Sequence, residues 1–238
     1  MSLVADGLIQ VSGKMQIKIS AIICLLLIIA ACEDAPSPLE ADVGLDYFPL
    51  KVGDWKVYDV ELINIGSDTT RYQLMESVVD TFSIMPEEIS YILHRFSRSH
   101  HELPWELDSA WTARLSGTYA VVVENNVPLA KVQFPVGKGE TWDGNTFNNR
   151  PEEIFEIASV DQPFQLEGET FSRSMEIIEK NVFDTLIVKD IQSAVYARRV
   201  GLIYKRKERI DFCRFVECLG EIESGILIEQ RLVDYGQE

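Results

Sequence analysis

Histidine, cysteine and basic residues are scarce in this chain, and each scarcity excludes a kind of chemistry. Of 238 residues, three are His and four are Cys, and 22 Lys and Arg stand against 38 Asp and Glu, for a net charge of −16. Because phosphate backbones are bound by clustered Lys and Arg, so acidic a chain is not expected to bind nucleic acid. The sequence also lacks a Gly-X-Ser-X-Gly nucleophile turn and a Gly-rich phosphate loop.

The few candidate metal ligands have the wrong spacing. His100 and His101 are adjacent, and adjacent side chains on a strand point to opposite faces, whereas a helical site needs i, i+4 spacing. His94 lies in a strand-like run. The oxygen-rich loop 143–149 lacks the EF-hand pattern and is interpreted as a plain turn. We therefore expect no metal and no cofactor, and we identify no catalytic residue in the sequence. A hydrolase with an unrecognised site is the third-ranked interpretation of the function.

Long apolar runs are also missing. The run from Ala21 to Ala31 has 11 residues, whereas a transmembrane helix needs about 20. Lys14 and Lys18 precede it, small residues end it and Cys32 follows, which is the layout of a secretory signal. We interpret residues 1–31 as a signal peptide, in which residues 1–14 are an over-extended start and Met15 is the better one.

The sequence Leu-Ile-Ile-Ala-Ala-Cys at residues 27–32 resembles the lipobox of bacterial lipoproteins. The resemblance implies that Cys32 is lipidated, becomes the mature N-terminus and holds the protein on a membrane of the cell envelope. We expect the outer membrane, with the protein facing the periplasm or the surface. Residues 32–46 are acidic, contain two prolines and are interpreted as a flexible tether. Without residues 1–31 the chain has 20 basic and 37 acidic residues, a net charge of −17.

Two cysteines remain in the mature chain. Cys213 and Cys218 form an even pair in an oxidising compartment, so we expect a disulfide between them. Four residues separate them rather than the two of a thioredoxin-like motif, and no His lies nearby in sequence to complete a zinc site.

Residues 47–238 are predicted to form a single all-β domain, an antiparallel barrel-like or strongly curved sheet with few short helices. In Val127–Phe134, Ala130 and Val132 alternate with Lys131 and Gln133, which predicts one buried and one wet face. A hairpin is expected around 124–126, and a short helix around 85–88 or 150–155. The predicted strands are 55–65, 88–96, 118–123, 127–134, 154–160, 171–178, 186–191, 195–204 and 225–235.

The stretch from Arg198 to Arg209 is unusually basic, with six Lys or Arg in twelve residues. We interpret it as a solvated or edge strand, because charged residues blunt exposed sheet edges. The alternative is a patch that binds lipid headgroups or lipopolysaccharide phosphates.

A short motif occurs twice. Phe48-Pro49 and Phe134-Pro135 are each followed by Gly, an acidic residue and Trp, which predicts the start of a strand and is compatible with two related halves. Three segments resemble a group of uncharacterised Bacteroidetes envelope lipoproteins. They are the opening at 47–58 (Tyr-Phe-Pro-Leu, Gly53, Trp55, Tyr58), the Val-Gly-Leu-Ile-Tyr-Lys run at 200–205 and the closing Asp-Tyr-Gly at 234–236. The resemblance spans most of the mature chain, and it implies no activity.

Trp105 and Trp111 are the remaining candidates for contact with a ligand. Exposed, they would stack on sugar rings; buried, they would line a core or an apolar cavity. The favoured interpretation is a non-enzymatic lipoprotein that binds or carries an apolar or lipid-like ligand on an apolar concave side. The alternative is an interaction module that binds glycan or a partner protein of an envelope complex.

Overall fold

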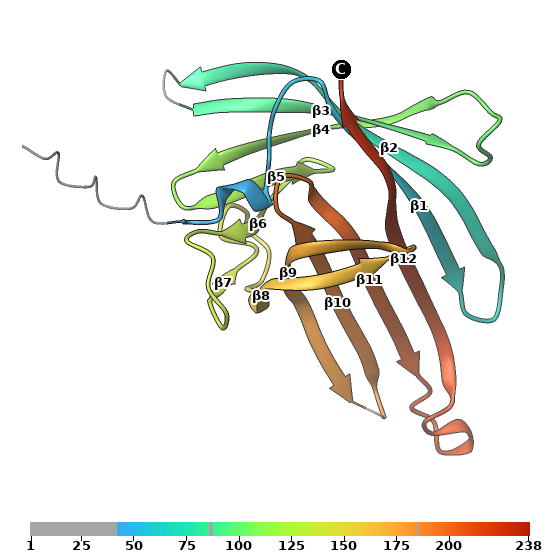
Figure 1. Ribbon diagram of the computed structural model, residues 1–238. Helices are drawn as coiled ribbons and strands as arrows, with labels where there is room; N and C mark the ends of the chain where they lie inside the picture. The colour runs from blue at the N-terminus through green and yellow to red at the C-terminus, as the bar shows by residue number, and fades with distance from the viewer. Residues whose placement is uncertain (1–41, 86–87, 185) are drawn as a thin grey trace, which may run out of the picture. The chain divides into compact units, whose positions relative to one another are not determined.

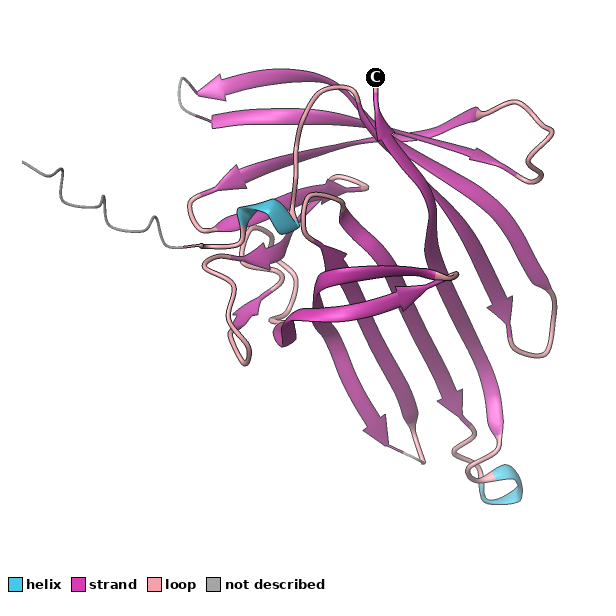
Figure 2. Cartoon of the chain, viewed as in Figure 1, coloured by secondary structure: helices cyan, strands magenta, loops and turns pink. Residues whose placement is uncertain are grey.

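Twelve antiparallel strands form one continuous, strongly curved sheet (Figures 1 and 2). The computed structural model describes residues 42–238 apart from 86, 87 and 185, and these residues form one compact unit. Two short 3-10 helices, η1 (Leu45–Tyr47) and η2 (Val216–Cys218), accompany the sheet. The strands are β1 (Asp54–Asn64), β2 (Thr69–Met85), β3 (Glu88–Arg98), β4 (Glu106–Ser116), β5 (Tyr119–Glu124), β6 (Val127–Gln133), β7 (Thr141–Asp143), β8 (Ile154–Leu166), β9 (Glu169–Asp184), β10 (Val188–Ala197), β11 (Gly201–Phe212) and β12 (Ile222–Gln237).

The sheet consists of two six-stranded meanders joined side by side. Its order runs from β6 down to β1, then from β12 down to β7, so that the first and last strands pair in the middle. Short turns make this meander possible. Asn125 and Asn126, for example, both have positive φ in the β5–β6 hairpin, as a tight two-residue turn requires.

Hydrogen bonds connect the two edge strands, so the sheet is nearly closed. The amide nitrogen of Ala130 on β6 donates to the carbonyl oxygen of Gly144 after β7, at 2.9 Å. The indole of Trp142 donates to the carbonyl oxygen of Ala130 at 2.8 Å, and Asn148 donates to that of Pro128, also at 2.8 Å. These bonds occupy backbone groups that an open edge would leave unpaired. The loop 143–149 therefore has a structural role.

Two hydrophobic clusters fill the unit. One gathers around Ile157, Met175, Ile177 and Tyr196, and is sealed by Trp142 against Phe155. The other lies where the end of the β8–β9 hairpin crosses the outside of β10–β12 (Figure 1). There the ring of Phe164 lies 5.8 Å from that of Tyr204. The hairpin thus covers the outer face of strands whose other face lines the inside.

The all-β prediction is confirmed, and so are the 124–126 hairpin and the Cys213–Cys218 disulfide. Several local predictions are wrong. Strands β2, β4 and β7 were not predicted, and the predicted strand 195–204 joins the end of β10 to the start of β11 across a turn. Residues 150–153 form no helix; the other predicted helix, 85–88, includes residues outside the described part.

The interpretation of the basic stretch as an edge strand is also wrong. Most of it forms β11, which lies between β10 and β12 in the middle of the sheet. Its side chains alternate between the inner and the outer face of the sheet, and those of Arg206 and Arg209 remain 43% and 50% exposed. Arg198, just before β11, turns outward and binds Asp161, Asp46 and Asp42. Asp42 and Asp46, which the sequence places in the tether, are thus held against the folded unit.

The part of the chain that the structure describes contains no helix long and apolar enough to cross a membrane.

Candidate functional site

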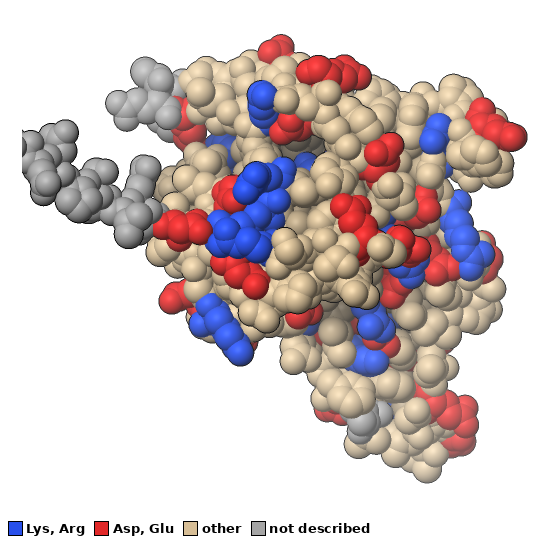
Figure 3. Space-filling view, viewed as in Figure 1, with Lys and Arg blue, Asp and Glu red and all other residues tan. Residues whose placement is uncertain are grey.

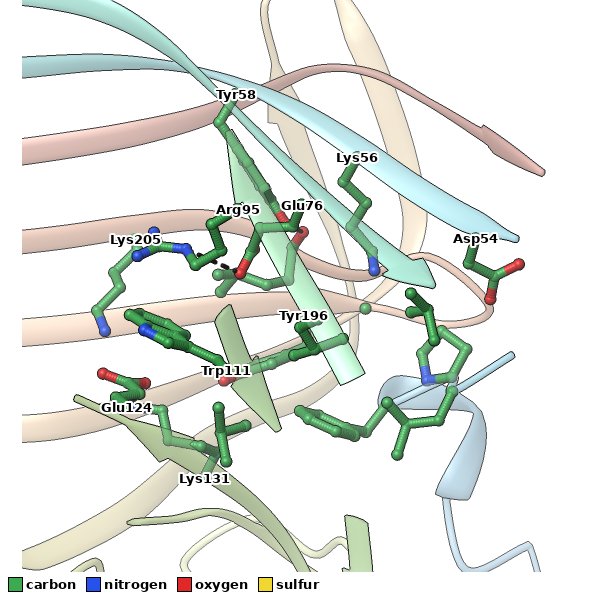
Figure 4. Close-up of a pocket in the computed structure, with 18 of the residues that line it drawn as sticks. Asp54, Lys56, Tyr58, Glu76, Arg95, Trp111, Glu124, Lys131, Tyr196 and Lys205 are labelled. Atoms are coloured by element: carbon green, nitrogen blue, oxygen red, sulfur yellow. Dashed lines mark hydrogen bonds and ion pairs between the residues drawn. The ribbon is translucent and has the colours of Figure 1, made fainter. Parts of the chain in front are cut away.

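A cleft on the concave side of the sheet is the candidate site. An inner cavity of about 110 Å³ lies beside an outer one of about 510 Å³. The two cavities adjoin, because six residues line both of them, and we call them together the interior cleft. Figure 4 shows the residues around the inner cavity. The shared residues are Arg95, Trp111, Glu124, Lys131, Lys205 and Gln230.

Strand alternation explains why charged side chains point into the cleft. On β11, Lys205, Lys207 and Arg209 are two residues apart and therefore share one face, which lines the outer cavity. Tyr204, between them and the turn, points to the opposite face and packs under the β8–β9 hairpin. Neighbouring strands continue the inward row, because Lys205 pairs with Gln230 of β12 and with Ala194 of β10.

A buried ion pair lies at the centre of the cleft. Lys131 of β6 lies 2.9 Å from Glu179 of β9 and 3.3 Å from Glu124 of β5. Only 7% of the Lys131 side chain and 6% of the Glu179 side chain are exposed. Lys205 approaches Glu179 to 3.8 Å from the other side. The pair connects β6, an edge strand of the sheet, to strand β9 of the second meander.

The charges in this pair stabilise each other. Burial alone would raise the pKa of Glu179, but the positive charges of Lys131 and Lys205 outweigh it and lower that pKa to about 2. Burial would likewise favour neutral Lys131, yet Glu179 and Glu124 raise its pKa above the ordinary value. The neighbouring Tyr196 hydroxyl has a raised pKa, chiefly because it is buried. Both members of the pair are therefore charged at neutral pH.

Arg95 and Trp111 form the adjoining part of the wall, next to Glu124 (Figure 4). The guanidinium carbon of Arg95 lies 3.7 Å from the centre of the Trp111 ring, a cation–π contact. Arg95 Nε is 3.4 Å from a carboxylate oxygen of Glu76, but without hydrogen-bond geometry. Trp111 Nε1 is buried and has no hydrogen-bond acceptor among the described residues. Two buried donors on this wall thus lack an acceptor.

Two lysines of the cleft have no carboxylate within ion-pair distance among the described residues. Lys56 lines the inner cavity and Lys207 the outer one, and neither forms an ion pair with a residue that the structure describes. Burial lowers the pKa of Lys56, against the raising effect of Glu76 and Asp54. The outer cavity therefore has more cations than carboxylates in its lining; two buried N–H donors of the walls, and the buried acceptor Glu179 Oε1, form no hydrogen bond with the described residues. No His, Ser or Cys is among the described residues that line either cavity.

The structure places the predicted site residues in different parts of the fold. Trp111 lines the cleft, whereas Trp105 does not; it lies under the guanidinium of Arg98, at 4.1 Å. Cys213 and Cys218 line neither cavity; they close the β11–β12 loop, where Phe215 and Val216 are exposed. Cys32 lies outside the described residues. Among the described residues no group of His, Cys, Asp or Glu is arranged to hold a metal ion.

The sequence-based interpretation missed the charged residues of the cleft. The alternation in β6 predicts that Lys131 lies on a wet face, but Lys131 is buried, because that face points into a nearly closed sheet. The concave side, expected to be apolar, is charged in its centre. One sequence signal points to this charged centre: Lys205, Lys207 and Arg209 are two residues apart, which places three cations on one face of a strand.

Solved structures similar to this chain include two proteins of Bacteroides and Parabacteroides species. A Bacteroides fragilis protein described as exported, with a YmcC-like fold, is 13% identical with a TM-score of 0.43, over 80% of this chain and 98% of that chain. A Parabacteroides distasonis protein described as a lipoprotein is 10% identical with a TM-score of 0.38, over the same shares. No model of a protein family and no curated protein matches the sequence. Similarity of this degree assigns neither a family nor a function.

Proposed function

We propose that this chain is a lipid-anchored, non-enzymatic protein of the bacterial cell envelope that binds a small ligand in its interior cleft. The single observation that supports binding is the cleft itself, two adjoining cavities inside a nearly closed sheet whose walls hold buried N–H donors without an acceptor. Small-molecule sites are typically concave and largely pre-formed, with a small number of polar groups that point into the same space. The anchor is supported by the lipobox-like sequence that ends at Cys32.

The size and charge of the cleft favour a small, partly polar ligand over a lipid. A cavity of about 150 Å³ holds one benzene ring, so the inner cavity of about 110 Å³ takes a short apolar group rather than an acyl chain. The outer cavity is ringed by charged side chains, which an acyl chain would leave desolvated.

Native mass spectrometry of the full chain, purified from the membranes of its native host, tests this proposal. We expect two additions to the mass of the chain: acyl groups attached through Cys32, and one small molecule released by gentle activation. In the variant Trp111→Ala, the released molecule should be lost while the acyl groups remain. In Cys32→Ala, the acyl groups should be lost.

A chain from the native host that releases no small molecule would contradict the binding role. An unmodified N-terminal cysteine would contradict the anchor. The two parts of the proposal are thus judged separately.

A further inference from the structure

The charge of the outer cavity is opposite to that of the whole chain. Its lining contains seven Lys and Arg and four Asp and Glu, although the chain has 22 basic and 38 acidic residues. On the face seen in Figure 3, by contrast, basic and acidic side chains are interspersed. Basic residues are thus concentrated where a concave wall focuses their field on one space.

The excess positive charge is not used up by ion pairs inside the cleft. Lys131, Lys180, Lys205 and Arg209 each have a carboxylate partner within 4 Å, but the described residues offer none to Lys207. Lys207 is half-buried, so part of its hydration is already lost. An anion in the outer cavity would restore a counter-charge to it.

Hydrogen bonding points to the same kind of ligand. Trp111 Nε1 can only donate, and so can Arg95 Nε; both are buried without an acceptor in the described part of the chain. Leaving a buried donor unpaired is unfavourable, because the donor has lost its water and gained no acceptor. Figure 4 shows Trp111 and Lys205 on the same side of the cleft, next to Glu124. Oxygen atoms of a ligand at this place would accept from the indole and face the lysines of β11.

We propose that the interior cleft binds an oxyanion, a carboxylate or a phosphate carried by a small molecule, between Trp111 and the β11 lysines Lys205 and Lys207. This inference rests on the proposed function, since it names the chemical class of the ligand that the cleft holds. Trp111 supplies a hydrogen bond and a flat surface, and Lys207 supplies a cation without a competing carboxylate.

Isothermal titration calorimetry on the full chain in a non-ionic detergent tests the inference with three matched aromatic compounds. Phenyl phosphate and benzoate carry an oxyanion, and benzylamine carries a cation of similar size. We expect one or both anions to bind and benzylamine to bind at least about tenfold more weakly. Tighter binding of phenyl phosphate would indicate a phosphate ligand, and tighter binding of benzoate a carboxylate ligand.

Two variants and a control locate the binding. Lys207→Gln and Trp111→Phe should each weaken anion binding about tenfold, which is the effect of one hydrogen bond to a charged group. Neither side chain holds an ion pair of the fold, so both variants should remain folded. Lys138→Gln removes the same charge at an exposed position outside the cleft and should change affinity less than about twofold.

Equal binding of benzylamine and the anions, or anion binding unaffected by Lys207→Gln and Trp111→Phe, would overturn the inference. If the chain from its native host releases a ligand without an acidic group, the inference fails and the proposed function stands. If that chain releases nothing and none of the three compounds binds, both fail.

Discussion

Replacement of Lys131 by methionine is expected to lower the free energy of unfolding by about 3–5 kcal/mol. Methionine keeps much of the volume of the lysine side chain but removes the charge that faces Glu179 at 2.9 Å. Glu179 is almost fully buried, so its carboxylate would be left with only the more distant Lys205. Urea unfolding followed by circular dichroism measures the loss.

Matched variants separate the charge from the packing. Lys131→Met combined with Glu179→Met removes both charges and should recover most of the lost stability, because apolar side chains of similar size often replace a buried pair without loss. Lys138→Met, at an exposed position, should change stability by less than about 0.5 kcal/mol. A single variant Lys131→Met as stable as the unaltered protein would show that the pair contributes nothing.

The same variant should change how stability depends on pH. The pKa of Glu179 is about 2 in the folded protein, below the ordinary value of 4.5, so the pair stabilises the fold above about pH 4.5. This contribution decreases as the pH falls from 4.5 towards 2. Without Lys131, burial raises the pKa of Glu179 instead, so protonation on acidification should restore part of the stability that Lys131→Met loses.

Replacement of Trp142 by alanine should also cost about 3–5 kcal/mol, the range for large aromatic side chains in cores. Trp142 is 4% exposed, packs edge-to-face on Phe155 and donates to the carbonyl oxygen of Ala130 across the nearly closed gap between β7 and β6. Loss of that bond should also speed amide hydrogen exchange in β6, the edge strand that it secures.

Trp55 provides the comparison for Trp142. It stands in the other copy of the Phe-Pro…Trp motif but is only half-buried, so Trp55→Ala should cost clearly less and leave exchange in β6 unchanged. Equal losses for the two tryptophans, or unchanged exchange in β6 of Trp142→Ala, would contradict a role of Trp142 in closing the sheet.

Local signals in the sequence were enough to predict the fold class. Asn125 and Asn126 accept the positive φ of a tight hairpin, and the β-favouring runs on either side of them pair as expected. Strand β2 was missed because it is rich in polar residues and bulges interrupt its two-residue period near Val78 and Ser83. These bulges belong to the pairing of β2 with β3, the next strand along the chain, and they shift which residues of β2 share a face.

The candidate site was harder to predict than the fold, for a physical reason. Alternation around Lys131 separates the two faces of β6, but it does not tell which face lies inside a sheet that closes on itself. The inside here accepts charges because Lys131 meets Glu179 from a strand 48 positions further along the chain. The sequence points to Trp111 as a candidate contact. The contact of Trp111 with Arg95 depends on the register between β3 and β4, and the position of Lys207 in the cleft depends on the register of β11.

The indole N–H signals of the full chain, labelled with ¹⁵N-tryptophan and titrated with phenyl phosphate, test the binding cleft most directly. The chain has four tryptophans, so each signal can be assigned by one Trp→Phe variant. We predict that the Trp111 signal moves with saturable dependence on phenyl phosphate, while the signal of Trp142, whose N–H is already bonded to Ala130, stays in place. A Trp111 signal that does not move at saturating phenyl phosphate, or four signals that move alike, would contradict an anion-binding site in the interior cleft.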